Sequence, residues 1–143
     1  MMKKILCCAL FLVLILFCFQ VEAKSVRIDY GKSEIYSQAE MNSAITLIKG
    51  RFDKWKGCRL KNIRYVGDKC NNSENISWLN EIATAREGYS DFTQCIEFIS
   101  DLYVSKEAAK YTVFDTNRKY RNYQWWLARN SKNEEWQLVS FGY

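Results

Sequence analysis

The C-terminal residues 120–143 constrain the fold of this chain more than any other stretch. They hold three of the five tryptophans, and two aromatic segments, 121–129 and 135–141, flank five polar residues. Aromatic segments of this length, joined by a short polar connection, predict an antiparallel hairpin. Adjacent residues of a strand point to opposite faces, so only one of Trp125 and Trp126 can face the interior. We expect Trp126 to point inward together with the small Ala128.

A long helix is predicted over 38–56. Ser37 and Glu40 have the spacing of a capping box, in which each side chain accepts a hydrogen bond from the other residue's backbone. Gly57 follows the segment and suits the left-handed conformation that ends many helices. The apolar residues between them recur at helical spacing and form one stripe: Met41, Ala44, Ile45, Ile48, Phe52 and Trp55.

The remaining segments predict one more helix and two more strands. Residues 58–66 indicate a strand with a bulge, and 91–103 indicate a strand with regular alternation. Ser73 is placed to cap a second helix that closes at Gly88. Residues 105–119 predict a loop with a turn of helix at 106–110, and residues 24–36 an extended lead-in or edge strand.

The order of these segments predicts an α+β fold. A long N-terminal helix and a second helix would pack on one side of a curved, mainly antiparallel sheet of about four strands that ends in the C-terminal hairpin. Residues 24–143 number 120, which suits a single domain over 37–143 after the lead-in.

Residues 1–23 have the features of a secretory signal peptide. Lys3 and Lys4 precede an apolar run over 5–19, and Ala23 supplies a small residue at the expected cleavage site. This pattern predicts a secreted or cell-surface protein. The run is shorter than the roughly 20 apolar residues of a spanning helix; an uncleaved anchor is the alternative and would be the chain's only contact with a membrane. Abundant Lys, Asn, Ile and Tyr, with no Pro or His, indicate a bacterial source.

Three cysteines follow the expected cleavage site: Cys58, Cys70 and Cys95. In an oxidising compartment they allow one disulfide and one free thiol, and all three pairings stay open. The absence of His removes a Cys–His catalytic pair, and three cysteines without a fourth ligand do not make a structural zinc site. We therefore expect neither a metal ion nor another cofactor.

The distribution of charge along the chain limits the kinds of molecule that the protein is expected to bind. Residues 24–143 carry 19 Lys and Arg and 15 Asp and Glu, a formal charge of +4 with both signs interspersed. Nucleic-acid binders concentrate positive charge in a patch or stripe, so we expect no nucleic-acid partner. Lys119, Arg121 and Arg129 could attract a cell-wall polyanion, although charges at a strand edge usually only keep the edge soluble. A small apolar ligand or a secreted protein are the other partners that the sequence allows.

Four short motifs carry a resemblance to a known group of proteins. They are Trp55-Lys56-Gly57-Cys58, Ile63-Arg64-Tyr65-x-Gly67-Asp68, Thr93-Gln94-Cys95-Ile96-Glu97-Phe98 and Trp125-Trp126-Leu127-Ala128-Arg129. Together with the order of elements they resemble small exported proteins of gut Firmicutes whose function is not established and whose fold is nuclear-transport-factor-two-like (cystatin-like, SnoaL-like). The resemblance covers about 32–143. It implies a cone-like sheet folded around a cavity below the long helix.

The resemblance also implies what an active site would need. Enzymes of that fold, such as steroid isomerases and polyketide cyclases, use an Asp general base inside the cone. Glu97 and Asp101 are weak catalytic candidates, because four residues along a strand separate them by roughly 13 Å, too far for a cooperating pair. The candidate ligand-binding residues are aromatic, although such residues more often form the core: Trp55, Tyr65, Trp125, Trp126 and Trp136.

The missing catalytic motifs and the surplus of tryptophan favour a binding protein over an enzyme. We predict a secreted, non-catalytic binding or interaction module of unknown ligand that uses an aromatic sheet face or cavity. The alternative is a small enzyme of isomerase or cyclase type with a carboxylate general base in the cone. Small size, export and the cystatin-like layout also allow a third interpretation, an inhibitor or toxin-like partner protein.

Overall fold

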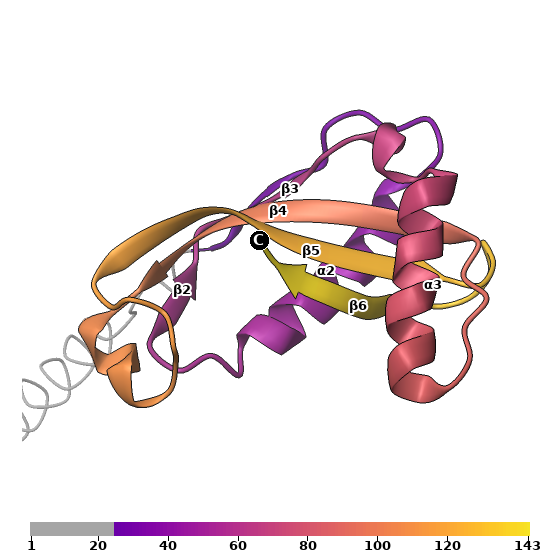
Figure 1. The fold of residues 1–143 in the computed structure, drawn as a ribbon. Helices are drawn as coiled ribbons and strands as arrows, with labels where there is room; N and C mark the ends of the chain where they lie inside the picture. The colour runs from indigo at the N-terminus through magenta and orange to yellow at the C-terminus, as the bar shows by residue number, and fades with distance from the viewer. Residues whose placement is uncertain (1–24) are drawn as a thin grey trace, which may run out of the picture.

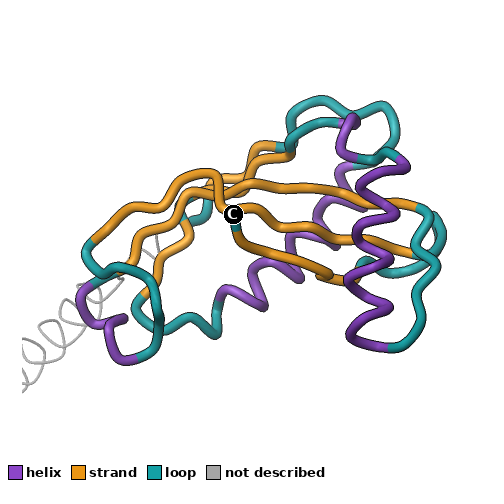
Figure 2. Tube along the Cα trace, in the orientation of Figure 1, coloured by secondary structure: helices purple, strands orange, loops and turns teal. Residues whose placement is uncertain are grey.

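The computed structural model describes residues 25–143, so the predicted signal peptide over 1–23 lies outside the described residues. Strands and helices follow one another along the chain as drawn in Figures 1 and 2. They are β1 (Arg27–Asp29), α2 (Gln38–Phe52), β2 (Cys58–Leu60), β3 (Asn62–Tyr65), the 3-10 helix η1 (Asp68–Cys70), α3 (Ser73–Glu87), β4 (Gln94–Val104), the 3-10 helix η2 (Lys106–Lys110), β5 (Arg118–Arg129) and β6 (Gln137–Gly142). Within 25–143 no helix is both long and apolar enough to span a bilayer.

The described strands form one mixed, open sheet of six strands. Its order is β1-β3-β4-β5-β6, and β2 pairs with the far end of β4. β1 is parallel to β3, and the other pairs are antiparallel. The fold is therefore α+β as predicted, but with more strands than about four. The lead-in supplies β1, and the predicted strand 58–66 divides at Lys61, whose N–H donates to the Asp101 carbonyl at 2.8 Å.

The central strands β4 and β5 run along most of the molecule (Figure 1). Their pairing extends from Gln94 opposite Arg129 to Val104 opposite Arg118, and its register shifts between Ser100 and Leu102. At this bulge Asn122 adopts a positive φ of 56°, and its N–H donates to Asp101 Oδ1 at 3.2 Å. A bulge bends and twists the paired strands, which accounts for the curvature of the sheet at this point.

The two helices cover opposite faces of the sheet, with α2 behind it and α3 in front (Figure 1). The adjacent tryptophans show this division. Trp125 contacts Phe52 of α2 with ring centroids 6.4 Å apart, and Trp126 contacts Trp78 of α3 at 5.5 Å. The prediction that both helices share one side is therefore wrong, and Trp125, not Trp126, faces the interior beneath α2. A helix stripe shows which side of a helix is apolar but not which face of the sheet it covers.

The first helix, α2, begins at the predicted capping box and ends early. Ser37 Oγ accepts from the Glu40 N–H at 3.2 Å, and the Ser37 N–H donates to Glu40 Oε2 at 2.8 Å. The helix stops at Phe52 instead of residue 56. Beyond it the chain turns and places the Trp55 ring 5.7 Å from that of Trp125. Packing against the sheet therefore decides this end, not the periodicity of the sequence.

Side chains fill the space between α2 and the sheet. Ile45 and Ile48 of the helix are buried with Phe98, Trp125 and Leu127 of the strands. Trp125 is fully covered, and its indole N–H donates to Ser100 Oγ at 3.0 Å. Within 25–143 the sheet is open, so it does not close into a cone.

The second helix, α3, is capped by Asn72 instead of Ser73. The Asn72 side chain accepts from the Asn75 N–H at 2.9 Å, and Gly88 ends the helix with a φ of 86°. Leu79 and Ala83 are buried against the sheet. Because α3 crosses only one end of its face (Figure 1), a large part of that face stays uncovered.

Candidate functional site: an aromatic and basic surface at the end of α2

Aromatic side chains cover the sheet beyond the end of α2. The helix stops at Phe52, while β4 and β5 continue past it, and the chain between them returns through η2. We call the exposed or half-buried groups here the basic aromatic surface. Its members are Arg51, Trp55, Lys56, Tyr111, Phe114, Arg118, Tyr120, Phe141 and Tyr143.

Trp55 lies at the centre of this surface. Its ring centroid is 5.8 Å from that of Phe114, 6.0 Å from that of Phe141 and 5.6 Å from that of Tyr123. Trp125 lies beneath Trp55 and is fully buried. Trp55 itself stays half-buried. Tilted and edge-to-face contacts of this kind hold the rings in fixed orientations while leaving part of each one accessible.

Three cations lie over rings of the basic aromatic surface. The Arg51 guanidinium is 4.8 Å from the ring centroid of Phe141, and the Lys56 ammonium is 5.2 Å from that of Tyr111. The Arg118 guanidinium is 5.6 Å from the ring of Tyr120. Cations at these distances are attracted by the negative face of the ring. Positive charge and aromatic surface therefore alternate across this part of the molecule.

The charge of the chain is distributed unevenly in space. Residues 49–59 and 105–121, which meet at this end of the sheet, carry 10 Lys and Arg against 3 Asp and Glu. The other residues of 25–143 carry 8 Lys and Arg against 12 Asp and Glu. One end of the molecule is therefore strongly basic although the whole chain is only weakly so. An open hollow of about 530 Å³ adjoins this end, lined by Gly57, Cys58, Arg59, Tyr103, Ser105 and Glu107.

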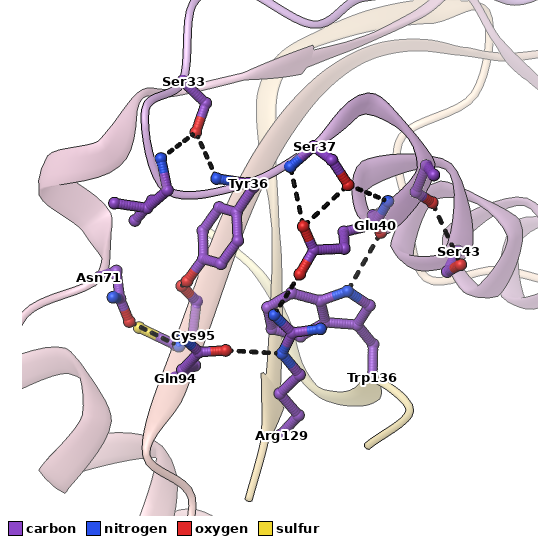
Figure 3. Close-up of polar contacts among 12 residues, drawn as sticks. Ser33, Tyr36, Ser37, Glu40, Ser43, Asn71, Gln94, Cys95, Arg129 and Trp136 are labelled. Atoms are coloured by element: carbon purple, nitrogen blue, oxygen red, sulfur yellow. Dashed lines mark hydrogen bonds and ion pairs between the residues drawn. The ribbon is translucent and has the colours of Figure 1, made fainter. Parts of the chain in front are cut away.

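Trp136 is part of a structural contact away from this surface (Figure 3). Its indole N–H donates to the Glu40 carbonyl at 3.1 Å, and the Arg129 guanidinium lies 4.2 Å from its ring. Arg129 Nη2 also donates to Glu40 Oε1 at 2.6 Å, and its Nε donates to Gln94 Oε1 at 2.7 Å. Arg129 is only 3% exposed. Its interpretation as an edge charge available to a polyanion is therefore wrong.

Tyr65 is likewise a core residue. It is buried beside Tyr36 and Phe98, and its hydroxyl donates to Asp68 Oδ1 at 2.8 Å. Burial and this hydrogen bond to a carboxylate raise the pKa of Tyr65 well above its usual value. The structure thus brings together Trp55 and Trp125 of the five aromatic candidates, and separates Tyr65, Trp126 and Trp136 from them.

The two candidate carboxylates lie on the α3 side of the sheet, away from the interior beneath α2. Asp101 is held at the bulge, where the side chain of Asn62 donates to it at 3.0 Å and Arg64 lies 3.6 Å away. Burial opposes its ionisation, but these groups and the Asn122 N–H outweigh that effect and lower its pKa. Glu97 lies opposite Trp126 in the register, and burial raises its pKa.

The three cysteines are all free thiols and occupy two places. Cys58 lies at the outer end of β4, opposite Val104. Cys70 and Cys95 are buried together at the other end, where Cys95 Sγ donates to the Cys70 carbonyl at 3.1 Å. Cys95 and Val104 are nine positions apart on β4, roughly 30 Å at strand spacing. A bridge from Cys58 to Cys95 is therefore incompatible with this fold.

Sequence reasoning missed most of the basic aromatic surface. Phe114 and Tyr111 lie in 105–119, a segment predicted as a loop with a turn of helix and no binding role. The signal was present, since Tyr111, Val113 and Phe114 form an apolar group within a charged segment. The sequence does not show that the cations Arg51, Lys56 and Arg118 lie on one surface. They are spread over 68 positions of the chain and come together only in the folded protein.

Fold and site together define a class: an α+β domain with an open sheet, a helix on each face and an aromatic, basic surface at one end. The chain matches no family model, no curated protein and no solved structure with which it was compared.

Proposed function

We propose that the protein is a secreted, non-catalytic binding module that holds an anionic polymer of sugar or polyol units on the basic aromatic surface. The observation that carries this proposal is the set of three cation–ring pairs formed by Arg51, Lys56 and Arg118. A ligand that binds to these three pairs contacts positive charges and aromatic rings next to one another.

The chemistry of the surface selects the class of ligand. Lysine and arginine attract phosphate or carboxylate groups, and arginine can bind them through two parallel hydrogen bonds. Half-buried rings such as Trp55 and Phe141 offer flat apolar faces to the C–H groups of a sugar or polyol. A polymer that repeats both features, as an anionic cell-wall polymer does, uses the whole surface.

The position of the carboxylates favours binding over catalysis. The enzyme alternative needs a general base inside the layer beneath α2. On that face β4 presents Ile96, Phe98, Ser100, Leu102 and Val104, which contain no carboxylate. Glu97 and Asp101 alternate with these residues and therefore point to the other face.

Isothermal titration with short poly(glycerol phosphate) tests the proposal, with uncharged dextran as the comparison polymer. We expect poly(glycerol phosphate) to bind and its affinity to fall with added salt, because neutralising ion contacts are screened. Lys56→Gln and Arg118→Gln should each weaken binding by about tenfold, the effect of roughly 1.4 kcal/mol. Lys69→Gln, at an exposed lysine on the opposite end of the molecule, serves as the matched control.

A second pair of variants tests the rings. Tyr143 is 72% exposed at the basic aromatic surface, and Tyr89 is 73% exposed far from it. Tyr143→Ser should weaken binding while Tyr89→Ser leaves it unchanged. Binding that survives both cation variants, or that is equally tight for dextran, would contradict an anionic ligand on this surface.

A further inference from the structure

A second site is indicated on the opposite face of the sheet, where α3 leaves β4 and β5 uncovered. Its centre is Glu97, which lies near the start of β4 directly opposite Trp126 of β5. Residues opposite each other in a register share one face, so the Glu97 carboxylate and the Trp126 ring are neighbours. This site is separated from the basic aromatic surface by the sheet itself and does not rest on the proposed function.

Glu97 differs from the other carboxylates that the fold partly encloses. Glu40 accepts from Ser37 and Arg129, and Asp68 accepts from Ser33, the Glu34 N–H and Tyr65. Among the described residues, by contrast, no group donates a hydrogen bond to the carboxylate of Glu97 or forms an ion pair with it. Among the described residues, the Glu97 carboxylate oxygens are not fully buried atoms, so they stay open to solvent. A carboxylate that is unpaired and reachable in this way is available to a ligand from outside the chain.

An exposed indole is linked to this carboxylate through Trp126, which lies opposite Glu97 in the register. Trp78 of α3 meets Trp126 edge to face, with ring centroids 5.5 Å apart and an interplanar angle of 81°. Trp126 is thereby covered, whereas Trp78 stays 39% exposed. Trp78 therefore presents an accessible ring whose position is fixed by a second ring and by the helix that carries it.

The combination points to a positively charged ligand. The negative face of an indole attracts cations more strongly than any other side-chain ring, and an unpaired carboxylate attracts them as well. Two arginines of neighbouring elements are engaged elsewhere: Arg86 of α3 donates to the Val139 carbonyl at 2.6 Å, and Arg64 of β3 donates to Asn122 at 2.9 Å. The ion pairs within 25–143 join Arg64 to Asp101, Arg118 to Asp115 and Arg129 to Glu40, and none of them involves Glu97.

We propose that Trp78 and Glu97 bind a small organic ammonium ion, with the cation over the Trp78 ring and its charge facing the Glu97 carboxylate. Trp126 positions the Trp78 ring from below. An ammonium group with an apolar surround fits better than a bare metal ion, because half of this site is aromatic and offers no oxygen ligands.

The experiment compares choline with its uncharged isostere 3,3-dimethyl-1-butanol, titrated into the protein at constant ionic strength. Tryptophan fluorescence and the indole N–H resonance of Trp78 report binding. We expect saturable changes with choline and none with the alcohol, because the two differ only in the charge. Equal responses would overturn the proposal and leave only an apolar contact.

Two variants assign the response to the residues. Glu97→Gln should weaken choline binding by about tenfold, and Trp78→Leu, which keeps an apolar side chain over Trp126, should abolish it. Glu81→Gln, at an exposed carboxylate of the same helix, is the matched control and should leave binding unchanged. Choline binding that persists in Glu97→Gln would refute the role of the carboxylate, and thermal unfolding of each variant verifies that the fold is intact.

Discussion

Among the described residues, Arg129 is the one charged residue that is fully buried, and its partners come from distant parts of the chain. Glu40 stands at the start of α2, Gln94 at the start of β4 and Trp136 just before β6. These partners offset the loss of hydration of the Arg129 guanidinium, since a buried ion without partners is strongly destabilising. The Arg129 contacts therefore join the first helix to the C-terminal hairpin (Figure 3).

Glu40→Gln is expected to lower the free energy of unfolding by about 3 kcal/mol, because it leaves the buried Arg129 without a counter-charge. Denaturant unfolding at neutral pH measures the change. The double variant Glu40→Gln/Arg129→Met should recover part of the loss, since both charges are then absent. A single variant as stable as the parent would show that the pair contributes nothing.

The same pair predicts a pH dependence. The hydrogen bond from Arg129 and those from Ser37 lower the pKa of Glu40 from its usual 4.5 to about 2. A depressed folded-state pKa means that the stabilisation is complete above pH 4.5 and is lost as the pH falls from 4.5 towards 2. Unfolding measured across that window should show a steeper loss in the parent than in Glu40→Gln. Parallel curves would argue against the ion pair as the cause.

The thiols should differ in reactivity. Burial raises the pKa of all three thiols, that of Cys95 to about 12, but Cys58 is only half-buried whereas Cys70 and Cys95 are buried. Thiolates react with maleimides, so the native reduced protein should be labelled at Cys58 first. Cys70 and Cys95 should react only after unfolding in guanidinium. Mass spectrometry of labelled peptides reads out the order, and early labelling of Cys95 would contradict the packing.

At the scale of elements, the turn after α2 sets the position of Trp55 on the basic aromatic surface. The turn after α2 carries Trp55 onto the sheet and passes through Gly57, which has a φ of 76°. A Cβ at Gly57 would lie 2.7 Å from the backbone nitrogen of Ala108 in η2. The close approach of this turn to η2 brings the two halves of the basic aromatic surface together.

Three glycine variants separate backbone strain from crowding. Gly57→Ala combines a positive φ with a clash against backbone and should cost about 3 kcal/mol or more. Gly88→Ala has a similar φ of 86° but open space around the new Cβ, so it should cost about 1 kcal/mol. Gly50→Ala, in α2 with open space, should stabilise by roughly 0.5–1 kcal/mol. Equal losses in the free energy of unfolding for Gly57→Ala and Gly88→Ala would show that η2 can move to accommodate the new Cβ at residue 57.

At the scale of the whole molecule, the sheet separates the basic aromatic surface on one face from the proposed Trp78 and Glu97 site on the other. α2 and its aromatic continuation cover one face, and α3 covers only part of the other (Figures 1 and 2). The anionic polymer and the ammonium ion proposed above would thus bind on opposite sides. Separate ligand sites on two faces need no communication, and each can be tested without disturbing the other.

Hydrogen exchange should reveal the unequal stability of this arrangement. Amides of β4 and of residues 124–128 of β5 should exchange only through global unfolding, because these segments pair with strands on both sides. Residues 111–117, which form a surface loop with few backbone hydrogen bonds, should exchange quickly. Mass spectrometry of exchanged peptides measures the contrast, and slow exchange in 111–117 would contradict it.

Local signals in the sequence are enough to predict several helix ends and turns of this protein. Ser37 and Glu40 predicted the start of α2, Gly88 the end of α3, and 106–110 a helical turn, because caps and turn residues act through neighbouring atoms. Long-range packing sets which helix covers which face, where α2 ends, and that Arg129 is buried instead of exposed. Those outcomes depend on contacts between residues far apart in the chain, such as Trp55 with Phe141, and no local pattern encodes them.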